Sequence, residues 1–333
     1  MKPSFLIWVN LMLLEIPIWA QPDCSAPSTG LIPINDLKKK TFNGWTGGLY
    51  PGGSNFLPEA HKVAGMKITA EKVCPRDMEG KPDLLSGKIV WLSIGMSNTT
   101  MESQQFLKLA GEYINKKPEL VFVDGAVGGM PASVISTGNN PRYYNYWNTV
   151  DTRLANAGVT SGQVQIIWYK EANIANSIPI MIYFDSLVVQ TKRVMNIIKQ
   201  RFPNASICYM ASRISARYAA TALNPEPYAY YTGWAIKKVI EDQINGDTLL
   251  SYSGPGARSP WLSWGVYLWS DGATPQAADK NIFWSCPSDF QNDGIHPSVP
   301  DGAKKVAEIL MNFYQNDTLS CKWFFKDPPS FCH

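Results

Sequence analysis

The sequence predicts a single α/β domain built on a doubly wound parallel sheet of about five strands. Short apolar runs alternate with longer segments of helical periodicity between residues 88 and 314, and this alternation is typical of parallel βαβ units. Each apolar run ends in glycine or polar residues, as strands do where they meet a loop. Neither an internal repeat nor a low-complexity linker interrupts the pattern, which favours one domain over two.

The first strand is predicted at 88–94 (KIVWLSI), a buried-type apolar run that ends at Gly95. A helix over 99–117 should follow, with Thr99 or Thr100 as its N-cap. The second strand, 119–123, runs into the glycine-rich stretch DGAVGG. The remaining elements follow the same alternation, with strands at 163–168, 206–210 and 264–268 and helices at 143–157, 180–201, 230–244 and 302–314.

The segments before residue 88 differ in character. Residues 1–20 carry an early lysine, an apolar run and Ala20, which together indicate a secretory signal peptide. A membrane anchor is the weaker interpretation, because Asn10, Glu15 and Pro17 interrupt a run that is already short for a span. Residues 21–87 are rich in Gly, Pro and Lys and predict an irregular N-terminal extension with at most short strands, packed on a main domain at 88–333.

Cysteine content and charge narrow the class of protein. All six cysteines lie after residue 20, so an exported chain could form up to three disulfides. The connectivity stays open, although proximity in sequence suggests Cys24 with Cys74 and Cys321 with Cys332 in the C-terminal tail. No paired C-x-x-C spacing indicates a metal site. The net charge of +3 is spread along the chain and argues against a nucleic-acid partner. We therefore expect a secreted protein, extracellular or periplasmic, with no membrane segment after signal cleavage.

One stretch near the C-terminus contains two candidate catalytic residues. Asp293 precedes His296 by three residues, and a carboxylate at that spacing can fix the tautomer of a histidine that moves protons near neutral pH. Ser97 lies at the junction of the first strand and its helix, where a helix N-terminus favours a developing oxyanion. Each residue also has a plainer interpretation, Ser97 as an ordinary N-cap and His296 as a structural histidine.

These blocks resemble the SGNH or GDSL-type hydrolases. The resemblance rests on Ile94-Gly95-Met96-Ser97-Asn98 after the first strand, DGAVGG after the second, Asn173 in IWYKEAN after the third, and NDGIHPSVPDGAKKVAEIL before the last helix. It implies a flavodoxin-like three-layer α/β/α sandwich and serine-ester hydrolysis without cofactor or metal. The implied triad is Ser97, His296 and Asp293. The implied oxyanion donors are Ser97, Gly125 or Gly128, and Asn173.

Two departures from the family pattern bear on substrate. Met96 stands where the family has an aspartate before the serine, and Lys170 stands where a glycine is expected. The stretch Glu171-Ala172-Asn173 is similar to that of the carbohydrate-esterase branch, which makes an acylated sugar the expected substrate. Candidate substrate contacts are Asn98, Glu171, Arg213, Trp264 and Trp269. Arg213 could equally be ion-paired, and core packing is the commoner fate of such tryptophans.

The sequence thus predicts a secreted serine esterase that removes acyl groups, with acetyl favoured, from a carbohydrate or another small ester. Two alternatives stay open: a catalytically silent carbohydrate-binding protein on the same scaffold, and an O-acyltransferase that uses the same triad. The sequence leaves the oligomeric state open.

Overall fold

The computed structural model describes residues 21–174 and 177–332. The predicted signal peptide at 1–20 lies outside them. At the centre is a five-stranded sheet in the order β4-β3-β5-β6-β7, with all neighbouring strands parallel. Its strands are β3 (Ile89–Gly95), β4 (Leu120–Asp124), β5 (Val164–Lys170), β6 (Ile207–Ala211) and β7 (Trp261–Val266). The chain passes from β3 outward to β4 and then crosses back to β5, so the switch point lies between β3 and β5, as in flavodoxin-like sheets.

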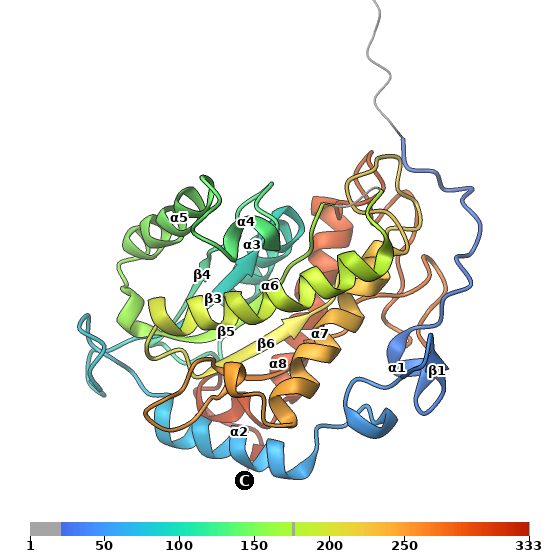
Figure 1. Ribbon diagram of the computed structural model, residues 1–333. Coiled ribbons are helices and arrows are strands. Elements are labelled where there is room, and N and C mark those ends of the chain that lie inside the picture. Colours follow the sequence, from blue (N-terminus) through green and yellow to red (C-terminus); the bar gives the residue numbers. More distant parts are fainter. Residues whose placement is uncertain (1–20, 175–176, 333) are drawn as a thin grey trace, which may run out of the picture.

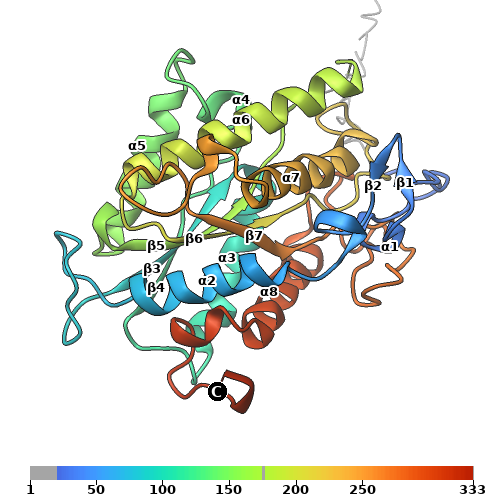
Figure 2. The ribbon, with the colours of Figure 1, turned by 60° about the horizontal axis from the view of Figure 1, so that its bottom comes forward.

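Helices cover both faces of the sheet (Figure 1). The turned view in Figure 2 shows α4, α5, α6 and α7 on one side of the strands and α2, α3 and α8 on the other. The bounds of the helices are α1 Ile34–Leu37, α2 Glu59–Lys72, α3 Ser97–Glu112, α4 Ala132–Ile135, α5 Tyr143–Asn156, α6 Ile180–Arg201, α7 Tyr228–Ile244 and α8 Lys304–Asn316. The predicted three-layer α/β/α fold is confirmed.

Strand β3 shows why the sequence folds this way. Its side chains alternate between two separate cores, with Val90 and Leu92 among the helices α5 to α7 and Trp91 packed with Phe106 of α3. Because both faces are buried, the strand reads as a continuous apolar run instead of an alternating one. The other strands follow the same rule, so the apolar runs located all five strands to within a few residues.

The N-terminal extension is more regular than the sequence predicted. A short hairpin, β1 (Thr41–Phe42) with β2 (Trp45–Thr46), matches the expected short strands. The 14-residue helix α2 was not predicted, and that interpretation of 59–72 is corrected. Its buried face holds His61, Gly65, Ile68 and Thr69, which do not form an apolar stripe in sequence. A Cβ at Gly65 would lie 2.6 Å from atoms of Trp261 and Leu319, so close packing against the domain holds this helix.

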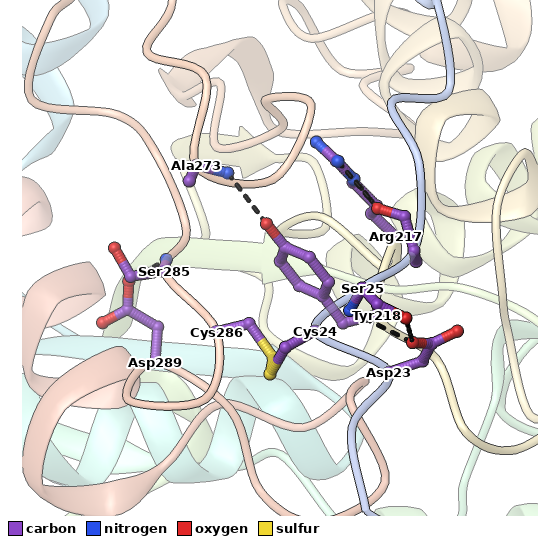
Figure 3. The surroundings of a disulfide bond; sticks show 10 residues. Asp23, Cys24, Ser25, Arg217, Tyr218, Ala273, Ser285, Cys286 and Asp289 are labelled. Carbon is purple, nitrogen blue, oxygen red and sulfur yellow. Dashed lines mark hydrogen bonds between the residues drawn. A yellow bond between two sulfur atoms is a disulfide. The ribbon is translucent and has the colours of Figure 1, made fainter.

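One suggested disulfide is wrong and one is confirmed. Cys24 pairs with Cys286, 262 residues away, and Cys74 is free. Cys321 pairs with Cys332, as proximity suggested. Figure 3 shows the first bond beside Tyr218, whose carbonyl accepts a hydrogen bond of 3.1 Å from the Asp23 backbone N–H. The bond therefore fastens the start of the described chain to the segment that leads into the His296 loop.

Candidate active site

Ser97 is the first residue of α3, immediately beyond the carboxyl end of β3. The turn that presents it requires a glycine at position 95. A Cβ there would lie 2.2 Å from the Lys170 carbonyl oxygen and 2.4 Å from Thr99 Oγ1. Met96 is the N-cap residue of α3, with extended backbone geometry, and its side chain makes no capping hydrogen bond. The first backbone N–H groups of α3 are therefore not occupied by the Met96 side chain.

His296 lies within hydrogen-bonding distance of both other predicted triad residues. The Oγ atom of Ser97 is 2.7 Å from Nε2 of His296, although 199 residues separate them in sequence. On the other side of the ring, Nδ1 of His296 is hydrogen-bonded to Oδ2 of Asp293. Such an arrangement leaves Nε2 able to accept the serine proton.

Asp293 is held as a carboxylate by its own loop. Its Oδ1 accepts hydrogen bonds from the backbone N–H groups of Ile295 (3.0 Å) and His296 (2.9 Å). Burial raises the pKa of Asp293, but these bonds and the His296 ring outweigh it and bring the pKa to about 2. Gly294 has a φ of 65°, and a Cβ there would lie 1.8 Å from the Tyr218 carbonyl oxygen. Only glycine fits at this point of the loop.

Two of the predicted substrate contacts also hold the histidine loop. Nδ2 of Asn98 and Nη2 of Arg213 each donate a 3.1 Å hydrogen bond to the carbonyl oxygen of Ile295. The loop is thereby fastened both to the helix that carries Ser97 and to the segment after β6. Both residues are buried and also border the cavity at Ser97. Their contact with substrate stays a prediction.

The predicted oxyanion donors are only partly assembled. Gly128 is exposed, and a Cβ at that position would be 3.8 Å from Cβ of Ser97. Within the described residues its N–H donates no hydrogen bond. Gly125, in contrast, donates its N–H to Ser93 Oγ at 3.2 Å and packs on Leu92, so this prediction is wrong.

Asn173 is not brought to the cavity at Ser97. Its Oδ1 accepts from the Ser133 backbone N–H at 2.9 Å, and its Nδ2 donates to Gln190 Oε1 at 2.6 Å. The neighbouring residue Ile174 borders the cavity instead. The third block of the family pattern therefore differs here in geometry as well as in sequence.

Glu171 was expected to touch substrate, and the structure corrects this. The residue is 2% exposed, one carboxyl oxygen accepts from the Ala172 backbone N–H, and the other has no partner among the described residues. Burial raises the pKa of Glu171 well above its ordinary value. Because Glu171 is buried and is not part of the lining of the cavity at Ser97, it is not placed to contact a ligand there.

The two tryptophans are likewise core residues. Nε1 of Trp264 donates to the Leu49 carbonyl at 2.8 Å, and Nε1 of Trp269 donates to Glu226 Oε1 at 2.7 Å. Both rings are buried in the core between the sheet and α7. Neither can serve as a stacking platform for a sugar, so their assignment as substrate contacts is wrong.

A buried ion pair beneath the site was not predicted. Nζ of Lys170 lies 2.6 Å from Oε2 of Glu102 on α3, and the two side chains are 1% and 0% exposed. Burial lowers the pKa of Lys170 to about 8, and the attraction of Glu102 opposes this shift. The carbonyl oxygen of the same lysine accepts from Thr99 Oγ1 at 2.6 Å. No local pattern in the sequence connects residues 68 positions apart, so sequence reasoning could not find this pair.

The cavity at Ser97 is small and mainly apolar. It has a volume of about 190 Å³, below the usual range for drug-sized ligands. Its lining consists of Met96, Ser97, Asn98, Gly129, Ile174, Arg213, Leu223, Asn224, Ile295 and His296. Sequence reasoning missed Ile174, Leu223 and Asn224, which follow strands β5 and β6 without a recognisable motif.

No protein-family model matches the sequence, and a comparison with curated proteins finds no relative. Among solved structures, the chain is similar to a protein from Slackia heliotrinireducens assigned as an SGNH hydrolase (14% identity, 68% of this chain and 99% of that one, TM-score 0.34). It is also similar to a protein from Bacteroides fragilis assigned as an acylhydrolase (14% identity, 79% of this chain and 100% of that one, TM-score 0.39). A third similar structure is the periplasmic domain of a lipopolysaccharide acetyltransferase of Salmonella ser. Paratyphi A (12% identity, 76% of this chain and 94% of that one, TM-score 0.35). Because these TM-scores lie below 0.5, the sheet order and the site geometry carry the argument.

Two further features concern metals and membranes. Over residues 21–174 and 177–332, no three His, Cys, Asp or Glu side chains gather as metal ligands would. In the same ranges, none of the helices combines the length and the apolar character that a membrane span needs. The two disulfides are compatible with an oxidising compartment.

Proposed function

We propose that this protein is a serine esterase in which Ser97, His296 and Asp293 form the catalytic triad. The single observation that carries the proposal is the 2.7 Å contact between Ser97 Oγ and His296 Nε2, with Asp293 bound to the opposite nitrogen. A serine at a helix N-terminus, a histidine and an ionised aspartate in this order are the parts that acyl transfer requires.

The chemistry follows from the geometry. Ser97 Oγ attacks the ester carbonyl carbon while its proton passes to His296 Nε2, and Asp293 stabilises the resulting imidazolium. The backbone N–H groups of Ser97 and Gly128 are the proposed oxyanion donors. The C–O bond to the alcohol then breaks, the alcohol leaves with the proton from His296, and water releases the acyl group from Ser97 by the same steps.

Three of the five candidate substrate contacts are not available to a sugar. Trp264, Trp269 and Glu171 are buried and outside the cavity lining, whereas Asn98 and Arg213 border the cavity. An acylated carbohydrate as substrate stays a prediction, as does secretion. A catalytically silent binding protein is disfavoured, because such a protein has no need to keep an aspartate, a histidine and a serine aligned.

Hydrolysis of p-nitrophenyl acetate tests the triad. Ser97→Ala and His296→Ala should each lower kcat on the order of 10⁴-fold or more, since the members of a triad act as a unit. Ser86→Ala, a matched change at an exposed serine whose hydroxyl bonds to Asp83, should leave kcat unchanged. Equal rates for wild type and Ser97→Ala would refute the assignment of the nucleophile.

A further inference from the structure

Large apolar side chains are exposed around the mouth of the Ser97 cavity. Ile174 and Leu223 line the cavity and yet are 48% and 40% exposed. Three more follow in the chain as it enters α6, namely Ile178, Met181 and Ile182, with exposed fractions from 39% to 56%. We call these five residues the apolar rim. Burying such side chains would be favourable, so a group of them beside a catalytic cavity indicates an apolar ligand.

Hydrogen bonds and ring contacts tie the rim to the cavity. The Ile178 carbonyl accepts from Tyr228 Oη at 2.6 Å, and the Tyr228 ring packs edge-on against Tyr183 at 5.1 Å. Tyr183 Oη in turn accepts from Nδ2 of Asn224, which lines the cavity, at 3.1 Å. Figure 1 shows α6 starting at the end of the sheet where the strands finish, beside the loop that follows β6. These contacts connect Ile178 and the first turn of α6, which carries Met181 and Ile182, to Asn224 in the cavity lining.

The rim carries no charge, which limits what it can bind. Among the residues that line the cavity, Arg213 is the one lysine or arginine, and it is buried and already donates to Ile295 and Asn224. Four of the residues that line the cavity are large and apolar: Met96, Ile174, Leu223 and Ile295. On the side chains of the rim, a sugar ring would leave its hydroxyl groups without hydrogen-bond partners. An alkyl chain would lose no hydrogen bonds there, and its burial would remove apolar surface from water.

We propose that the apolar rim extends the Ser97 cavity into a binding surface for an acyl chain longer than acetyl. This inference rests on the proposed esterase function and names its substrate class: esters of medium-length fatty acids. The carbonyl group would sit at Ser97, and the chain would pass Ile174 and Leu223 towards Ile178 and the first turn of α6.

Chain-length profiles test the proposal. For p-nitrophenyl acetate, butyrate and hexanoate, kcat/KM of the wild type should rise by up to about fourfold per methylene that becomes buried. The double variant Ile178→Ser/Ile182→Ser should flatten this rise, lowering the hexanoate-to-acetate ratio at least fivefold. Val189→Ser is the matched control, since Val189 lies on the same helix, is 48% exposed and is outside the rim. It should keep the wild-type ratio.

A binding measurement separates this proposal from the esterase function. Calorimetric titration of Ser97→Ala with p-nitrophenyl hexanoate should show binding that the added rim substitutions weaken and the added Val189→Ser does not. If the wild type hydrolyses no ester but this pattern holds, the esterase function fails and the rim stands. A flat or falling chain-length profile, or equal binding in rim and control variants, would overturn the rim. Rim-dependent sedimentation with phosphatidylcholine vesicles and a flat profile would assign the surface to a membrane instead.

Discussion

Replacing Lys170 with methionine is expected to destabilise the fold strongly while leaving every surface residue in place. Lys170 Nζ is 2.6 Å from Glu102 Oε2, and neither side chain is more than 1% exposed. Methionine fills a similar volume but leaves the Glu102 carboxylate in the interior without its cation. Removing one partner of a buried pair costs about 3–5 kcal/mol, a large part of the roughly 5–15 kcal/mol by which domains are stable.

Glu102 would respond by taking up a proton. Burial already raises the pKa of Glu102, and Lys170 is the main group that opposes this shift. The double variant Lys170→Met/Glu102→Leu removes both charges, so it should recover most of the loss, with a coupling of at least about 2 kcal/mol between the two sites. Urea unfolding at pH 7 of the wild type, both single variants and the double variant measures this coupling. Single variants that each cost less than about 1 kcal/mol and simply add in the double would refute the reasoning.

Three further predictions concern the loop, the oxyanion and the disulfide. The folded-state pKa of Asp293, about 2, is below its ordinary 3.8, so this group adds stability above pH 3.8 that is lost as pH falls towards 2. When the pH is lowered from 5 to 2, the free energy of unfolding measured with urea should therefore fall by about 1–2 kcal/mol less in Asp293→Asn than in the wild type. Equal decreases in the two proteins would count against a lowered pKa of Asp293. Gly128→Pro removes the backbone N–H and should lower kcat/KM for p-nitrophenyl acetate at least tenfold, whereas Gly128→Ala keeps that N–H, places its Cβ no closer than 3.8 Å to other atoms and should keep most of the wild-type rate; a proline variant as active as the alanine variant would remove Gly128 from the oxyanion site. Cys24→Ser opens a link that spans 262 residues and should lower the free energy of unfolding by about 2–5 kcal/mol, whereas a loss below 1 kcal/mol would show that the N-terminal segment is held by its other contacts.

Local periodicity was sufficient to predict the strands and the long helices of the main domain. Helix α6 was predicted at 180–201 and occupies Ile180–Arg201, because a long amphipathic pattern follows Pro179 and ends before Pro203. The Asp293 to His296 loop was also predictable, since both functional groups and the required glycine lie within four residues. Its partner Ser97 followed from the strand-to-helix junction.

Features that depend on contacts between distant residues could not be predicted in this way. Helix α2 has no apolar stripe, and its position depends on Trp261 and Leu319. Whether a tryptophan such as Trp264 faces ligand or core depends on what packs over it, here Leu49 and Tyr50 of the N-terminal extension. The partner of Cys24 is 262 residues away.

By itself the sequence determined the alternation of the five strands with the long helices of the main domain and the identity of the three proposed catalytic groups, because periodicity and short motifs are local properties of a chain. Only the tertiary structure decided which neighbouring groups serve the site. In the folded protein the N–H of Gly125 is bonded to Ser93, Glu171 is buried with one of its two carboxyl oxygens unpartnered among the described residues, and the apolar rim stays exposed. The physical reason is that burial and hydrogen-bond partners are set by packing between segments, and no single segment encodes them.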